Sequence, residues 1–118
     1  MTQVEKAKFR HSDEWKDFRL LCKSVSGGVD FITGEPLQRG WELHHLDVTE
    51  DGYTKIKDVK DFVCLNSVTH TFLHYIYPKV NNLTKAEYDA TMYQMFDRFY
   101  EVLSEMIRRE RAIYGQKV

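Results

Sequence analysis

The sequence predicts a small α+β domain, and three features of the chain indicate this fold class. Two short apolar segments, about Trp41 to Leu46 and Phe62 to Leu65, have the length and composition of β-strands. In one segment before them and one after them, apolar residues recur at spacings of three and four, as on amphipathic helices. The chain has 118 residues, which fits one domain over residues 1–118.

Composition predicts a folded protein without a membrane anchor. Hydrophobic residues make up 42% of the chain, and seven Phe, seven Tyr and two Trp supply material for a core. No apolar run approaches the length of a membrane span, and the polar N-terminus does not resemble a secretory signal. We therefore expect a cytoplasmic protein whose two cysteines, Cys22 and Cys64, are buried free thiols.

The N-terminal third is predicted to form one helix. Ser12 is a plausible N-cap, and an apolar stripe follows at helical spacing until Gly27 and Gly28 end the pattern. The stripe consists of Trp15, Phe18, Cys22 and Val25. We interpret it as core packing, and we expect residues 1–11 to be frayed.

A strand–loop–strand–helix unit is predicted over about residues 41–77. The strands are the two apolar segments, and a helix from about Ser67 to Tyr77 should end ahead of Pro78. A second, longer helix should cover about residues 84–114, because Thr84 and Glu87 form a capping box ahead of a long apolar stripe. Such a stripe usually packs in a core, but a protein partner or a homodimer through this helix stays open.

Four of the five histidines lie in two tight pairs within the predicted unit. His44 and His45 are adjacent, so on a strand their rings point to opposite faces. His70 and His74 are four residues apart, so on a helix they share one face. Three imidazoles can then converge on a cation while a fourth stands beside it and moves protons. This pattern predicts a metal-dependent hydrolase site.

The stretch from Trp41 to Tyr77 resembles the HNH nucleases, and within them the DNase domains of nuclease colicins. The resemblance rests on the His-His pair, the spacing to Asp61 and the H-x-x-x-H ending. It implies a ββα-metal (His-Me finger) core in which His44, His70 and His74 hold the metal and His45 is the general base. It also implies DNA cleavage to 5′-phosphate and 3′-hydroxyl ends.

The chain departs from this family at two places. Asp61 falls where the family has its middle asparagine, although it can still accept a hydrogen bond from His45 and orient the ring; Asn66 is a second candidate for that role. Many HNH proteins also carry a four-cysteine zinc knuckle, and here its positions hold other residues: Asp30, Thr33, Asn66 and Thr69. We predict that direct hydrogen bonds replace the zinc there. A calcium ion held by these oxygens is the alternative.

The connection between the strands offers further polar groups. Asp47 is a candidate acceptor behind the metal ligands. The lysines Lys55, Lys57 and Lys60 are either solvated or contact phosphates. The net charge of −1 predicts weak DNA binding or help from a partner, because phosphate neutralisation dominates DNA affinity.

The sequence therefore predicts an HNH-type DNA endonuclease with one divalent metal ion and no structural four-cysteine zinc. Imidazole ligands suit Zn, Ni, Co or Mn, and the resemblance also allows Mg. Phage and mobile-element nucleases have this size. Two alternatives stay open: a catalytically weak or inactive binding module within a DNA-processing complex, and an RNase that uses the same centre.

Overall fold

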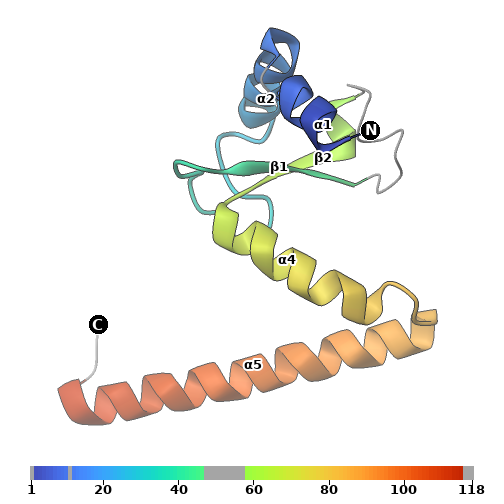
Figure 1. The fold of residues 1–118 in the computed structure, drawn as a ribbon. Coiled ribbons are helices and arrows are strands. Elements are labelled where there is room, and N and C mark those ends of the chain that lie inside the picture. Colours follow the sequence, from blue (N-terminus) through green and yellow to red (C-terminus); the bar gives the residue numbers. More distant parts are fainter. Residues whose placement is uncertain (1, 11, 47–57, 116–118) are drawn as a thin grey trace. The chain divides into compact units, whose positions relative to one another are not determined.

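The computed structural model describes residues 2–10, 12–46 and 58–115 (Figure 1). The chain divides into two compact units, Met1–Tyr75 and Ile76–Val118, which are described here separately. The prediction of a single domain stays a prediction. The helices and strands are α1 (Gln3–Arg10), α2 (Asp13–Val25), β1 (Glu42–His45), the 3-10 helix η1 (Val59–Asp61), β2 (Phe62–Leu65), α4 (Ser67–Val80) and α5 (Lys85–Tyr114). The predicted α+β class is confirmed.

The N-terminal segment is helical, so the expectation of a frayed start was wrong. Helix α1 begins with a capping box. The Glu5 amide donates to the Thr2 hydroxyl at 3.1 Å, and the Thr2 amide donates to the Glu5 carboxylate. This reciprocal pair satisfies two amides that otherwise lack partners in the first turn. The spacing Thr2-x-x-Glu5 is typical of a capping box and could have predicted the start of α1.

Helix α2 forms one wall of the core, as its stripe predicts. Ser12 caps it by accepting from the Trp15 amide at 3.2 Å. Trp15, Phe18 and Cys22 are buried together with four residues from the strands and the segment before them: Trp41, Leu43, Phe62 and Cys64. Val25, at the end of the predicted stripe, is exposed instead. The Arg19 guanidinium lies 3.6 Å from the centre of the Trp41 ring and donates to the Trp41 carbonyl, which fixes the start of β1 on α2.

The two strands form an antiparallel pair whose two faces have different partners. Glu42 pairs with Leu65, and His45 pairs with Phe62. Because side chains alternate along a strand, Leu43 and His45 share one face while Glu42 and His44 share the other. The first face carries the core residues that pack with α2. Figure 1 shows α2 on one side of the pair and the start of α4 on the other.

Helix α4 extends three residues beyond its predicted end and contains Pro78 in its last turn. A proline removes one backbone donor, and here the following turn still closes, because the Asn81 amide donates to the Tyr77 carbonyl at 3.0 Å. The proline therefore marks the last turn of the helix and does not prevent it.

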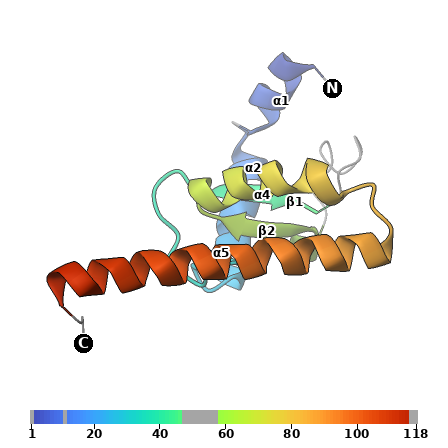
Figure 2. The same ribbon diagram turned by 90° about the horizontal axis from the view of Figure 1, so that it is seen from below.

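Helix α5 agrees with its predicted range. The capping box of Thr84 and Glu87 is formed, and the helix runs unbroken to Tyr114 (Figure 2). None of its thirty residues is buried. Because the two units are described separately, the prediction that the stripe packs in a core stays a prediction. Within the part of the chain that the structure describes, no helix has the length and apolar character needed to cross a membrane.

Candidate metal centre

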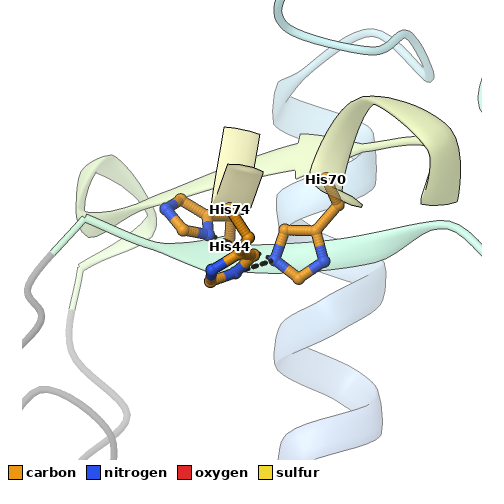
Figure 3. Close-up of side chains that lie close together, drawn as sticks. All are labelled: His44, His70 and His74. Carbon is orange, nitrogen blue, oxygen red and sulfur yellow. Dashed lines mark hydrogen bonds between the residues drawn. The ribbon is translucent and has the colours of Figure 1, made fainter. Parts of the chain in front are cut away.

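Three histidines from β1 and α4 meet at one point, as the two spacings predict. One ring nitrogen from each of His44, His70 and His74 lies within 4.8 Å of the other two. Figure 3 shows the three rings turned toward one another, His44 from the strand and the other two from the helix. The first two side chains are half-buried and His74 is exposed, so the cluster opens to solvent on one side.

The spacing of these nitrogens fits a metal ion. Nε2 of His70 lies 3.2 Å from Nδ1 of His44 and 3.0 Å from Nε2 of His74. A tetrahedral ion bound at about 2.0–2.1 Å needs ligand nitrogens about 3.3 Å apart. The donor set, three imidazoles with one side open, is the set that a catalytic zinc-type centre requires.

Glu42 is a functional candidate that the sequence reasoning missed. Its carboxylate contacts Nδ1 of His70. A proton held on Nδ1 by this carboxylate leaves the lone pair of Nε2 free, and Nε2 is the atom that faces His44 and His74. Such a carboxylate behind a ligand fixes both the tautomer and the orientation of the ring. The signal was present in the sequence, since Glu42 precedes His44 by two residues and therefore shares its face.

His44 is kept neutral by its surroundings. Burial and, to a smaller extent, the neighbouring charges of His70, His74 and His45 together lower its pKa to about 4. Metal ions bind the neutral imidazole, so a low pKa keeps this ligand ready at neutral pH.

His45 lies on the opposite face of β1 from His44. Its ring is stacked on Trp15, with centroids 6.1 Å apart and an angle of 9° between the planes. It also meets the Phe62 ring edge-on at 4.8 Å. The side chain remains half-buried. The structure thus separates the three converging histidines from the fourth.

Asp61 meets the end of β1 through its main chain. Its carbonyl accepts from the Leu46 amide at 2.9 Å, one residue beyond His45. The expected contact between its carboxylate and the His45 ring stays a prediction. Lys60 is exposed on η1, whereas Asp47, Lys55 and Lys57 lie outside the described residues.

The four positions that replace the zinc knuckle are connected through one buried carboxylate. Asp30 is 1% exposed. One of its oxygens accepts from the amides of Ile32 and Thr33, at 2.8 and 2.9 Å. The other accepts from the Asn66 amide at 2.8 Å, and the Thr69 side chain also donates to this carboxylate. We call this arrangement the Asp30 clasp.

The Asp30 clasp joins the loop before β1 to the start of α4. Asn66 completes it, because its side-chain oxygen accepts from the Gln38 amide at 2.8 Å and its side-chain nitrogen donates to the Pro36 carbonyl at 3.2 Å. Burial alone would raise the pKa of Asp30, but the hydrogen bonds from Thr33, Asn66, Thr69 and Ile32 outweigh it and lower the pKa. The carboxylate is therefore ionised, and it holds the first turn of the helix that carries His70 and His74. The side chain of Asn66 is thus part of the Asp30 clasp, whereas the sequence offered it as a second candidate for orienting the His45 ring.

Comparison with known proteins gives no relative. No protein family, curated protein or solved structure matches this chain.

Proposed function

We propose that the chain is a metal-dependent endonuclease of the HNH type that hydrolyses phosphodiester bonds in DNA. The observation that carries this proposal is the convergence of His44, His70 and His74 on one point, while the adjacent His45 stays outside the cluster. A purely structural metal site has no need of this fourth histidine. Metal-assisted hydrolysis uses a metal centre with an open side and a nearby base. Three ring nitrogens and a fourth histidine fit these requirements.

In this proposal, the metal ligands lie at one face of β1 and the general base lies at the other. His44, His70 and His74 hold the ion, and Glu42 orients His70. The ion, when bound, supplies Lewis acidity at the phosphate and at the leaving oxygen. His45 accepts a proton from the attacking water, a task for which an imidazole is suited at neutral pH. Zn, Ni, Co and Mn suit the imidazole ligands, and Mg remains an ion to test.

A binding module is the second candidate, and the packing of His45 favours it. The ring is stacked on Trp15 and contacts Phe62, so it also has a structural role in the core. The net charge of −1 is low for a protein that grips DNA on its own. In this case the metal would be structural and the nuclease chemistry would be absent.

Nicking of supercoiled plasmid by the purified protein tests the proposal. Reactions contain EDTA or one of the ions Mg, Mn, Zn, Ni and Co, and the same series is run on an RNA substrate. We expect metal-dependent nicking of DNA by the wild type. His45→Ala should abolish nicking yet bind the metal as tightly as the wild type, whereas His74→Ala should lose both, because it removes a ligand.

The two candidates give different results in this assay. Nicking that persists in His45→Ala would contradict the assignment of the base. A wild type that binds the metal by calorimetry but cuts neither DNA nor RNA with any ion would contradict the nuclease proposal and favour the binding module. Cleavage confined to RNA would replace the substrate class and keep the mechanism.

A further inference from the structure

Apolar side chains of α5, most of them exposed, form a continuous seam with a seven-residue repeat. They follow one another at alternating steps of four and three residues, which is the a/d pattern of a coiled coil. The seam consists of Tyr88, Met92, Met95, Phe99, Val102, Met106 and Ile113, with Arg109 at the one polar position. Val102, Met106 and Ile113 are 58%, 60% and 73% exposed. Phe96 and Leu103 widen the seam on one side, and both are also exposed.

The length of α5 decides what can cover this seam. Thirty residues at 1.5 Å per residue make a helix about 45 Å long. A compact unit the size of Met1–Tyr75 has a diameter of about 30 Å. A single helix that covers the seam from end to end has to be as long as α5. A second copy of α5 has this length and the same repeat.

The charges of α5 favour an antiparallel pair of copies. Residues 85–97 carry one lysine against Glu87, Asp89 and Asp97, while residues 108–114 carry three arginines against one glutamate. Antiparallel pairing brings the acidic start of each helix to the basic end of the other. Parallel pairing would place Arg109 directly against Arg109 of the second copy.

One antiparallel register satisfies the whole seam. Phe99 of one copy faces Val102 of the other, and in the same register the remaining positions pair a to d as antiparallel coiled coils require. These layers are Met95 with Met106, Tyr88 with Ile113, and Met92 with the aliphatic stem of Arg109. On the flank, Arg98 faces Glu105 of the second copy, and two-fold symmetry makes this ion pair twice. Asp89 faces Glu110 on the other flank, and its charge is already paired with Lys85 in its own helix at 2.5 Å.

We propose that the protein forms a homodimer through antiparallel pairing of α5 along this seam. The proposal does not depend on the nuclease activity, because it uses no residue of the metal centre. It predicts a two-fold interface in which the same face of α5 is used by both copies.

Sedimentation equilibrium of the full chain over a range of micromolar concentrations tests the dimer. We expect a species of twice the 14.0 kDa chain mass, and Val102→Glu at the centre of the seam should convert it to monomer. Tyr100→Glu is the matched control, because Tyr100 is also exposed but lies outside the a/d positions. Circular dichroism should show that both variants remain folded. A wild type that stays monomeric over the whole range would overturn the proposal.

Engineered cysteines distinguish the two orientations. Under mild oxidation Met106→Cys alone should give no disulfide between copies, whereas a mixture of Met95→Cys and Met106→Cys should give one, because these positions face each other only in the antiparallel register. Cys22 and Cys64 are buried, so the wild type serves as the blank. Efficient self-linkage of Met106→Cys would show a parallel pair and refute the register.

A charge exchange tests the flank without disturbing the seam. Arg98→Glu and Glu105→Arg should each raise the dimer dissociation constant several-fold, and the double variant should recover most of the loss. Glu105 also pairs with Arg108 and Arg109 in its own helix, at 2.5 and 2.8 Å, so the helicity of each variant is measured as well. Additive losses in the double variant would contradict the pairing of Arg98 with Glu105.

Discussion

Glu42 illustrates how a single residue decides the chemistry of its neighbour. Its contact with Nδ1 of His70 directs the opposite nitrogen of that ring toward His44 and His74. Glu42→Ala should therefore weaken metal binding about 10–100-fold, as measured by competition with a chromogenic chelator. Glu42→Gln should lose less, because the amide oxygen still accepts the Nδ1 proton. Glu35→Ala removes an exposed carboxylate outside the cluster of Glu42 and the three histidines and should change nothing. Equal affinities in all four proteins would show that Glu42 does not orient the ligand.

The depressed pKa of His44 makes the metal-free protein sensitive to mild acid. The folded pKa is about 4 and the unfolded value is about 6.5, so between these pH values the unfolded chain binds more protons than the folded one. Stability is then fully present above about pH 6.5 and falls as the pH drops toward 4. Urea denaturation in EDTA at pH 7 and pH 5 measures this loss. His44→Gln should show a smaller difference between the two pH values, and an unchanged difference would exclude His44 as the source.

At the residue scale, the sequence predicted the convergence of three histidines but not the carboxylate that contacts one of them. Alternation on a strand and the i, i+4 rule on a helix are geometric consequences of the backbone, so the convergence of His44, His70 and His74 followed from spacing once the elements were placed. The role of Glu42 depends on which helix meets its face of β1, and this is a tertiary contact that no local pattern contains.

At the scale of elements, the Asp30 clasp connects the loop before β1 with the first turn of α4. Asp30→Asn replaces an acceptor oxygen with a donor and removes the charge that the amides of Ile32, Thr33 and Asn66 solvate. We expect a loss of about 2–4 kcal/mol in the free energy of unfolding, because charge-assisted hydrogen bonds are strong and their buried donors would remain. Equilibrium urea denaturation gives the number.

A second aspartate provides the matched control for this change. Asp58 also accepts from a backbone amide, that of Lys60 at 3.1 Å, but it is exposed. Asp58→Asn should cost about 1 kcal/mol or less. If both variants lost the same free energy, burial of the Asp30 clasp would not be the source of its strength.

The starts of the helices were predictable where the sequence contains a recognisable N-cap residue. Ser12 and Thr84 mark the starts of α2 and α5, and both helices begin there. Thr2 and Glu5 mark the start of α1 in the same way. The expectation of a frayed N-terminus was wrong because it rested on polar composition and not on this cap. Pro78 predicted the wrong end for α4. Proline removes only one backbone donor, and the last turn still closes because the Asn81 amide donates to the Tyr77 carbonyl.

At the scale of the whole molecule, the net charge limits the DNA binding that the proposed function requires. With a net charge of −1, we expect few phosphate contacts, on the order of two. Plasmid nicking at subsaturating protein should then fall about tenfold between 50 and 200 mM salt, because the slope of affinity with salt scales with the number of contacts. A fall of about a thousandfold or more would show a broad basic interface that the formal charge conceals.

What covers the apolar stripe of α5 is the largest feature that the sequence does not predict. An apolar stripe has the same pattern whether its own chain or another molecule covers it, so periodicity gives the face and not its partner. The exposure of Val102 and Met106 is therefore information that only the three-dimensional structure supplies.

The Asp30 clasp also bears on how the protein matures in a cell. A knuckle built on four thiolates has to acquire zinc before its loops hold together, and its sulfur atoms have to be protected from oxidation until then. Here the same junction closes with a carboxylate and backbone amides that the chain brings with it. The clasp therefore closes without an ion, and uptake of the metal that we propose for the histidines would be a separate event.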